Sequence, residues 1–446
     1  MVVWNMREYT TVRRRGFLKA TGGGAAAVGL AGCLGGTDDD VTISARFMDA
    51  PGFEEFFEEH TQAFEEETGV EVEVELMGWS DAFSQQLTSI TSQTGPDVEE
   101  IASSWLPQQV EANGWMDFQE IDNIDVSTDT YFEPPVDIAE YDGMIVGSPW
   151  YWGPRAHIQY EPMMEEAGLS GSPETWDELI EMGEQFNEEN DDDDQYFFGL
   201  STLQNAGSQF FSTMLWQNGG DLLSEDYSEP LFHHDEGVEA ANFWKDLFYE
   251  HDVMESSTSE WGTDEAQSAF INQRMASTWG TLQFIFEYAD QDGVSTEDFT
   301  ANQLPAGPRG ESAVFYGLEL VGIHPWTDHP EESAEWVNYL ARPEVNAELA
   351  ETVSMLPAVE ESFEHDTFQN PIFQSFRNEI LPTGRTFPQF YGWGEIEDVL
   401  NTTMQQIITD AATDNWEPGD TEAQLQEAAD QVQTIIDAAD PELEAE

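Results

Sequence analysis

Apolar positions after residue 40 change their spacing several times, and each spacing predicts an element. Residues 41–47 alternate as a first strand does, and phenylalanines at positions 53, 56, 57 and 64 recur at helical spacing before Gly69 ends the helix. Residues 70–76 read Val-Glu-Val-Glu-Val-Glu-Leu, the alternation of a strand with one wet face. A second helix is predicted over 81–91 and a third strand over 97–102. This order predicts a mainly parallel sheet covered by helices, with ligands at the carboxyl ends of its strands.

The second half of the chain shows the same alternation of predicted strands and helices, with more helix. Thr175 stands three residues before Glu178, which is a capping box and predicts a helix through about residue 187. Apolar residues between Leu425 and Ile436 recur at helical spacing and predict a C-terminal amphipathic helix. We find no internal repeat of fixed period.

The charged residues predict a strongly acidic surface. The 446 residues carry 91 Asp and Glu against 13 Lys and Arg, a formal net charge of −78. Nucleic acid and anionic lipid are therefore excluded as partners, because both are bound through Lys and Arg. The hydrophobic content of 39% and aromatic content of 12% still predict a folded protein. Such acidity in a folded chain indicates an extreme halophile, since concentrated salt screens like charges. A calcium-loaded acidic protein is the alternative, but residues 190–194 lack the Gly and Glu of an EF-hand loop.

The N-terminus resembles an export signal. Arg14 and Arg15 precede a short stretch rich in Gly and Ala, as in a twin-arginine signal. The run Leu30-Ala31-Gly32-Cys33 resembles a lipobox, and Cys33 is the only cysteine of the protein. We expect residues 1–32 to be a signal peptide, Cys33 to carry lipid, and residues 33–40 to be a flexible tether that holds the body at the outer face of the membrane.

A search for catalytic motifs returns nothing. No P-loop, dinucleotide fingerprint, nucleophile elbow or zinc helix is present, and the eight His show no ligand spacing. Paired carboxylates could do glycosidase work, but among 91 acids any pairing arises by chance. The sequence predicts no enzyme, no metal and no cofactor.

Several short motifs, in order, resemble the extracellular solute-binding proteins of ABC importers, in particular the maltose/trehalose-type branch. They extend from about residue 41 to 436, and the run from Pro173 to Leu179 is the most specific. The pieces include Thr94-Gly95-Pro96-Asp97-Val98, Asn113-Gly114-Trp115, Val146-Gly147-Ser148-Pro149-Trp150, Pro173-Glu174-Thr175-Trp176-Asp177-Glu178-Leu179, Trp279-Gly280, Leu304-Pro305 and Leu356-Pro357. The family usually has Asn after the tyrosine matching Tyr160, whereas Glu161 stands here, which puts a ligand contact at that position in doubt.

The resemblance implies two α/β lobes with a ligand cleft between them, each lobe a mainly parallel sheet flanked by helices. We expect residues 41–147 and 305–355 in lobe one, and 148–304 and 356–446 in lobe two. Hinge closure would bury the ligand between the lobes.

Aromatic residues near the predicted crossovers suggest a sugar, because aromatic faces stack on the C–H faces of pyranoses. Three successive rings, Trp150, Tyr151 and Trp152, cannot all face one core if they alternate along a strand, so one is expected in the cleft. Arg155 could bind a hydroxyl pair or an acidic group of a ligand, but it is expected to pair with one of the many acids. The candidate ligand-binding residues, several taken from the resemblance, are Trp79, Asp81, Ser104, Trp105, Trp150, Tyr151, Trp152, Trp279, Gly280, Tyr316, Gly317 and Trp393.

The sequence as a whole predicts a monomeric, lipid-anchored sugar receptor that delivers its ligand to a membrane permease. A polyamine receptor of the same fold is an alternative, because an acidic aromatic site attracts cations. A secreted glycosidase would share aromatic clefts but release shorter products. A surface scaffold or adhesin would show no change in Trp fluorescence with ligand.

Overall fold

A computed structural model describes residues 41–439 with the exception of 191–193, 204, 290, 292 and 414. The predictions for Arg14, Arg15 and Cys33 therefore concern residues outside the described part of the chain. The described chain opens with the predicted alternation: β1 (Thr42–Met48), α1 (Phe53–Thr68), β2 (Glu71–Met77), α2 (Trp79–Ser92) and β3 (Val98–Ala102). Gly69 ends α1 with a positive φ of 80°, a conformation that favours glycine.

The burial of the first elements follows their sequence patterns. The phenylalanines of α1 are buried on one face, as the spacing predicts. Glu71, Glu73 and Glu75 of β2 are exposed while Val72 between them is buried. β2 is the edge strand of its sheet, where outward charges discourage pairing with other chains.

The large sheet has seven strands. β3 is followed across the sheet by β11 (Val314–Ile323), β6 (Ser148–Pro154) and β12 (Leu356–Pro357), and β13 (Gly384–Arg385) pairs with β11. β1 is parallel to β2 and β3, but β11 is antiparallel to both β3 and β6. The sheet is therefore mixed rather than mainly parallel, because β11 runs back beside strands that the chain formed earlier.

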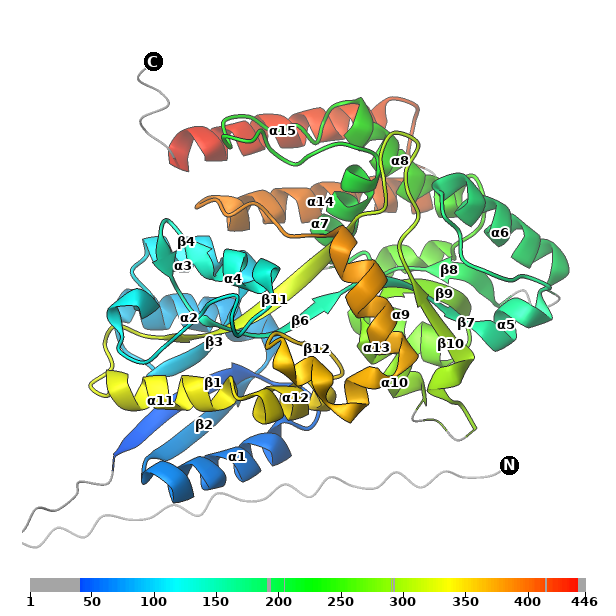
Figure 1. Ribbon diagram of the computed structural model, residues 1–446. Coiled ribbons are helices and arrows are strands. Elements are labelled where there is room, and N and C mark those ends of the chain that lie inside the picture. Colours follow the sequence, from blue (N-terminus) through cyan, green and yellow to red (C-terminus); the bar gives the residue numbers. More distant parts are fainter. Residues whose placement is uncertain are drawn as a thin grey trace, which may run out of the picture. The chain divides into compact units, whose positions relative to one another are not determined.

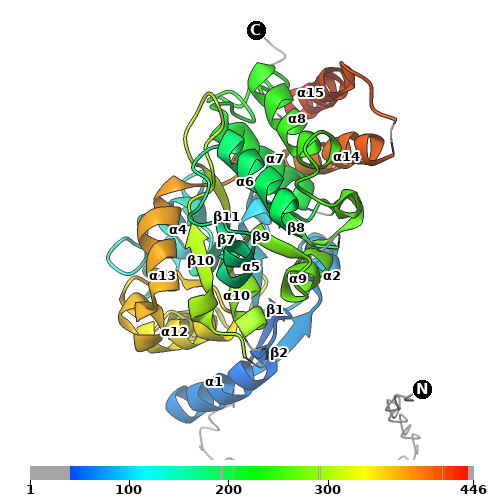
Figure 2. The same ribbon diagram turned by 90° about the vertical axis from the view of Figure 1, so that its right-hand side faces the viewer.

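The small sheet has four strands in the order β10 (Phe299–Asn302), β7 (Ala156–Tyr160), β9 (Met275–Gly280) and β8 (Tyr196–Gly199). Figure 2 shows this order in the view turned by 90°. β8 is parallel to β9, whereas β7 is antiparallel to both of its neighbours. This sheet is also mixed.

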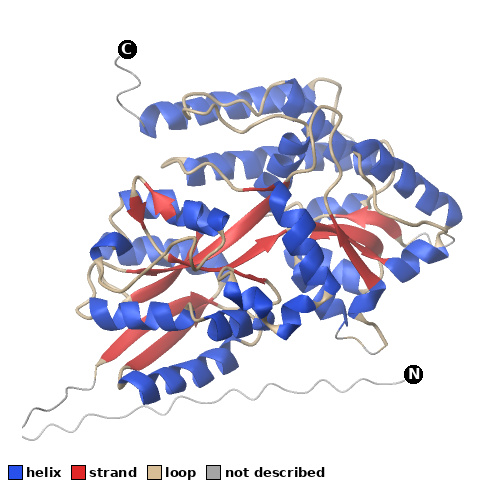
Figure 3. Cartoon of the chain, in the orientation of Figure 1, coloured by secondary structure: helices blue, strands red, loops and turns tan. Residues whose placement is uncertain are grey.

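Arg155 is the single residue between β6 of the large sheet and β7 of the small one. The chain therefore passes from one sheet to the other without a loop. Figure 1 shows β6 and β11 reaching from the large sheet toward the small one, and Figure 3 shows helices flanking both sheets. The boundary between the predicted lobes stays a prediction, with β6 and β12 in the same sheet as β1.

Helices supply the rest of the body. Thr175 caps α6 by accepting a hydrogen bond from the Glu178 amide at 3.2 Å, which confirms the predicted helix start. The principal helices are α6 (Trp176–Glu189), α7 (Ala206–Gln217), α8 (Asp235–Tyr249), α9 (Thr263–Ile271), α10 (Leu282–Ala289), α11 (Pro330–Leu340), α12 (Pro343–Thr352), α14 (Trp393–Ala412) and α15 (Asp420–Ala439). The shorter elements are α3 (Leu106–Glu111), α4 (Glu133–Ala139), β4 (Glu140–Tyr141), β5 (Met144–Ile145), α5 (Glu161–Glu166) and α13 (Pro371–Ser375).

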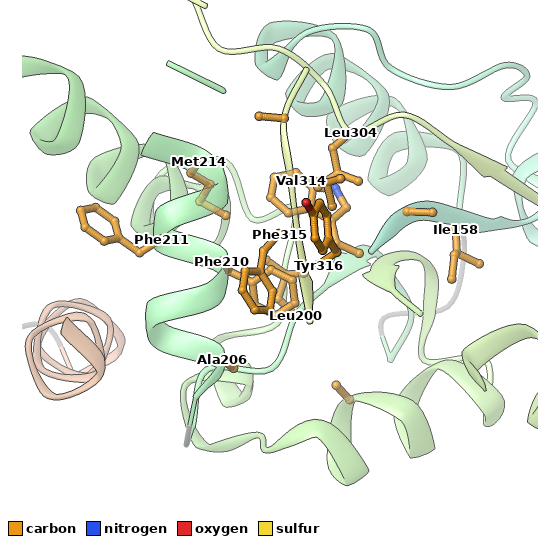
Figure 4. Close-up of a cluster of buried hydrophobic side chains, with 14 of the residues drawn as sticks. Ile158, Leu200, Ala206, Phe210, Phe211, Met214, Leu304, Val314, Phe315 and Tyr316 are labelled. Carbon is orange, nitrogen blue, oxygen red and sulfur yellow. The ribbon is translucent and has the colours of Figure 1, made fainter. Parts of the chain in front are cut away.

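Two main hydrophobic clusters hold these layers together. One packs α1, α11 and α12 against the large sheet, and the other joins the small sheet to α7, α14 and α15. Figure 4 shows part of the second cluster, where Phe210 and Met214 of α7 point toward Val314 and Phe315 of β11. The N-terminal half of β11 is therefore fixed to α7 by apolar contacts.

One buried ion pair crosses the large sheet. Arg46 of β1 pairs with Glu99 of β3, directly opposite in the strand register, and Glu99 also accepts a hydrogen bond from His324 at 2.8 Å. The His324 ring is stacked between Trp115 and Trp326, with centroid distances of 4.1 and 4.0 Å. Each charged group thus has a partner, as burial requires.

Candidate functional site

The carboxyl ends of β1, β2 and β3 meet at one edge of the large sheet because the three strands are parallel. β6 also ends at this edge, since it is parallel to β3 through the antiparallel strand β11 between them. We call the side chains gathered there the strand-end site. It comprises Trp79, Ser103, Trp105, Gly153, Arg155, Gly317 and Glu319.

An aromatic surface forms one part of the strand-end site. Trp79 opens α2 directly after β2 and is 43% exposed. Its ring lies 6.1 Å from that of Trp105, which follows β3, and Phe83 lies 5.3 Å from Trp105 on the other side. Trp105 packs against a small buried cluster that includes Met48 and Met77. Exposed rings on a packed base are suited to stacking on an apolar ligand face.

Asp81 and Ser104 lie beside these rings, as the sequence placed them. Asp81 is exposed in the first turn of α2. Ser104 is half-buried in the turn after β3, and the hydroxyl of its neighbour Ser103 accepts a hydrogen bond from the Leu318 amide at 3.3 Å. The turn is thereby tied to β11.

The three successive rings of β6 are all buried. Trp150, Tyr151 and Trp152 are 1%, 6% and 2% exposed. Trp150 lies 4.9 Å from the Phe47 ring in the cluster under α1, whereas the Trp152 Nε1 group donates to the Pro357 carbonyl within the other cluster. Trp150 and Tyr151 lie in one cluster and Trp152 in the other, because a shift of register between Glu319 and Leu320 interrupts the alternation, and both environments are cores. A ligand contact from any of them stays a prediction.

The remaining aromatic candidates are also packed inside. Trp279 donates from Nε1 to His157 Nδ1 at 3.2 Å, and Trp393 at the start of α14 packs on Phe387 at 4.6 Å. Tyr316 meets the Trp152 ring edge-on at 5.5 Å. A side chain at Gly280 would meet the Phe284 ring at 2.9 Å. Trp279, Trp393 and Tyr316 are therefore buried in the protein interior.

Gly317 differs from those candidates because space remains over it. A Cβ atom built on Gly317 would have no neighbour closer than 3.9 Å, the nearest being Arg155 Nη1 and Phe315 Cε1. Across the register lies Gly153, whose own space is taken by Met355 Sδ at 2.9 Å from a built Cβ. The open space is therefore on the Gly317 side of the glycine pair.

Arg155 does not pair with an acid, so that expectation is wrong. Among the described residues its guanidinium donates to the Gly153 carbonyl at 2.9 Å and to Gln209 Oε1 at 2.6 Å, and no ion pair joins it to a carboxylate. The group lies 4.9 Å from the centroid of the Phe315 ring. Burial lowers the pKa of Arg155 to about 10, while the charge of Glu319 acts in the opposite direction. Arg155 stays charged at neutral pH.

Two acids at the strand-end site were missed by sequence reasoning. Glu100 of β3 accepts from the Tyr151 hydroxyl at 2.9 Å and from the Met48 amide at 2.7 Å. Burial raises the pKa of Glu100 to about 8. Burial, followed by the negative charge of Glu100, raises the pKa of Glu319 well above its ordinary value. The available signal was a charged residue inside an otherwise apolar strand, as in Leu318-Glu319-Leu320.

Glu161 lies away from this site. It follows β7 at the end opposite to Arg155, and its Oε1 atom accepts a hydrogen bond from Thr300 at 2.7 Å. Five residues of strand separate the two ends, a length of roughly 17 Å at 3.3 Å per residue. The departure at Glu161 therefore does not alter the strand-end site.

Two hollows on the surface lie elsewhere. One of about 500 Å³ follows an exposed face of α1 and is lined by four glutamates. The other, about 460 Å³, lies between Trp261 and Arg274 along α9. Each is bordered mainly by one outer helix, and neither includes a residue of the strand-end site.

In the described part of the chain, no group of three or more His, Cys, Asp and Glu side chains is placed to hold a metal ion. None of the helices in that part has both the length and the apolar character needed to cross a membrane.

Known proteins of similar sequence and structure agree with this architecture. A binding protein of Brucella abortus (strain 2308) is 23% identical over 388 residues, which cover 85% of this chain and 90% of the relative. The diacetylchitobiose binding protein DasA of Streptomyces coelicolor is 23% identical over 224 residues, 48% of this chain and 51% of that protein. Maltose-bound MalE3 of T. maritima superposes with a TM-score of 0.78 at 19% identity, over 89% of this chain and 100% of that one.

Two mixed sheets with flanking helices and a site at the strand ends define an α/β protein of the periplasmic-binding-protein fold, like MalE. The sequence profile of the bacterial extracellular solute-binding proteins matches residues 59–374. The chain belongs to that family. It is the substrate-binding protein of an ABC transporter, and it binds a solute rather than catalysing a reaction.

Proposed function

We propose that this protein captures an extracellular sugar or oligosaccharide and delivers it to the permease of an ABC importer. The single observation that carries the proposal is the exposed Trp79 ring beside Trp105 at the carboxyl ends of the parallel strands. Aromatic surfaces of this kind stack on the C–H faces of sugars. Two similar proteins point the same way, since their names and titles mention diacetylchitobiose and maltose.

The mechanism in this proposal is closure of two lobes. Lobe one would comprise residues 41–147 and 305–355, and lobe two residues 148–304 and 356–446. A ligand that contacts both lobes only when they are shut selects the closed state. Residues 1–32 would be removed as a twin-arginine signal, and lipid on Cys33 would hold the body at the outer face of the membrane.

A polyamine is the second candidate ligand, because Glu100 and Glu319 lie at the same strand ends. Arg155 disfavours it, since its guanidinium lies close enough to affect the pKa of Glu319 and repels a cation in the same space. A neutral polyol meets no such opposition. We therefore favour the sugar.

The test is a titration of the purified body in molar salt with maltose, diacetylchitobiose and spermidine, followed by calorimetry and by X-ray scattering. We expect one of the saccharides to bind and to reduce the radius of gyration, while spermidine does not. Binding without any change in scattering would remove closure from the mechanism. Binding of spermidine alone would replace the sugar by a polyamine, and release of shorter products would indicate a glycosidase.

A further inference from the structure

The strands β6 and β11 place a carboxylate and a guanidinium on either side of a glycine pair. In the register, Glu319 is opposite Tyr151 and Gly317 is opposite Gly153. Arg155 directly follows the end of β6 and donates back to the Gly153 carbonyl. Side chains two apart on a strand point to the same face, with Cα atoms roughly 6.6 Å apart along it. Gly317 therefore separates Glu319 from Arg155 by one unfilled position.

The two charged groups keep unused hydrogen-bonding capacity. Glu319 Oε2 is enclosed and has no hydrogen-bond partner in the described structure. Arg155 uses two N–H groups, toward the Gly153 carbonyl and Gln209 Oε1, of the five that a guanidinium offers. An enclosed acceptor without a partner is destabilising unless a ligand or water satisfies it.

The position between these groups is not crowded on the Gly317 side. The nearest atoms to a built Cβ are 3.9 Å away, and one of them is Arg155 Nη1. Glu100 does not compete for a ligand, because Tyr151 and Met48 already donate to both of its oxygens. Glu319 Oε2 is therefore an unused acceptor, and Arg155 keeps unused N–H donors.

We propose that the space over Gly317 is a subsite for two adjacent hydroxyl groups of a neutral polyol, one donating to Glu319 Oε2 and the other accepting from Arg155. The subsite rests on the proposed function, because it lies in the same strand-end site as Trp79 and Trp105. It adds the polar contacts that aromatic stacking lacks. It also disfavours a cation, which would face the charged guanidinium of Arg155.

The experiment measures the affinity of the full body for maltose and diacetylchitobiose by calorimetry in molar salt, using wild type, Glu319→Gln and Arg155→Lys. We expect each substitution to weaken binding of the bound saccharide about 10- to 100-fold, the effect of leaving a buried hydrogen-bonding group without its proper partner. The matched controls are Glu59→Gln on the exposed face of α1 and Arg274→Lys beside α9, which should leave affinity unchanged.

A third variant tests the space itself. Gly317→Val should fold, because its Cβ meets nothing closer than 3.9 Å and β-branched residues suit strands. We expect its ligand-free unfolding midpoint to stay near the wild-type value while saccharide binding falls at least about 10-fold, as steric occlusion of a required contact predicts.

The outcomes separate the subsite from the function. If wild type binds a saccharide and all three variants bind it equally well, the subsite is wrong and the sugar receptor stands. If wild type binds neither saccharide but binds spermidine through Glu319, both are overturned. If it binds none of the three, the sugar function fails, and the subsite falls with it.

Discussion

The hydroxyl of Tyr151 donates a hydrogen bond to Glu100 Oε1 at 2.9 Å, inside the large sheet and out of contact with solvent. The same carboxylate accepts from the Met48 amide. Burial nevertheless dominates and raises the pKa of Glu100 to about 8. The carboxyl is protonated at neutral pH, and Tyr151 and Met48 hold it between β1 and β6.

This raised pKa predicts how stability depends on pH. The folded pKa exceeds that of the unfolded chain, so the stabilisation is complete below the unfolded pKa and is lost as pH rises through about 8. Burial acts in the same direction on Glu397, whose pKa rises to about 7. We expect the free energy of unfolding to fall by about 1.4 kcal/mol per pH unit for each such proton released.

Glu100→Gln isolates the contribution of Glu100. The amide resembles the protonated acid, so the variant should be more stable than wild type at pH 9 and similar to it at about pH 4, below the ordinary pKa of 4.5. Denaturant unfolding at both pH values measures the difference. A constant difference across this range would mean that the pKa of Glu100 is the same in the folded and the unfolded protein.

His157 predicts the opposite behaviour in acid. Burial lowers the pKa of His157 to about 3, and its Nδ1 accepts from Trp279. The unfolded chain binds the proton first, so stability from this residue is present above pH 6.5 and is lost below it. His157→Gln keeps an acceptor for Trp279 and removes the titration. Its unfolding midpoint should change less between pH 6.5 and 4 than that of wild type, and equal slopes would contradict the assignment.

The tryptophans should separate into two groups on substitution. Trp79→Ala removes a half-exposed ring, and we expect it to weaken saccharide binding while lowering stability by less than about 1.5 kcal/mol. Trp150→Ala empties a core position and should lower stability by about 3–5 kcal/mol. Thermal unfolding without ligand, followed by calorimetry at a temperature where both variants are folded, distinguishes them. Equal stability losses would contradict the different burial of the two rings.

Salt should govern the stability of the whole body. The net charge of −78 repels itself most strongly when the Debye length rises from about 3 Å at 1 M to about 10 Å at 0.1 M salt. We expect the unfolding midpoint to fall on dialysis to low salt. Sucrose at matched water activity serves as the control, and protection by sucrose equal to that by salt would show that screening is not the cause.

The anchor prediction concerns Cys33 alone. Cys33→Ser should move the protein from the membrane fraction to the medium, because the acyl chain can no longer attach. Substitution of Ser103, another small polar residue but within the body, should leave the protein in the membrane fraction. Retention of Cys33→Ser at the membrane would remove the lipid anchor from the proposal.

Much of the fold was predictable because local patterns encode it. The phenylalanine spacing of α1, the alternation of β2 and the Thr175 cap each act over a few residues. The position of Trp79 and Trp105 after parallel strands was predictable for the same reason. The antiparallel direction of β11 was not, since it depends on contacts with strands far away in the chain.

The polar half of the site could not be predicted. Among 91 acids, the apolar neighbours of Glu319 indicate a buried carboxyl, but they do not show that one of its oxygens is enclosed and unpartnered. Burial of Trp150, Tyr151 and Trp152 likewise depends on β6 lying between β11 and β12 with both faces covered. Alternation did not place these rings, because a shift of register between β6 and β11 puts Trp150 and Tyr151 in one core and Trp152 in the other.

Arg155 occupies an unusual place, since it is both the one residue between β6 and β7 and a group that faces the open space over Gly317. Any swivel of the small sheet against the large one must turn the backbone torsions of this arginine, among those of the other crossings. A solute that binds the Arg155 guanidinium would also restrict this connection between the two sheets. Ligand binding and movement between the two sheets would then both depend on Arg155, so a substitution there would alter both.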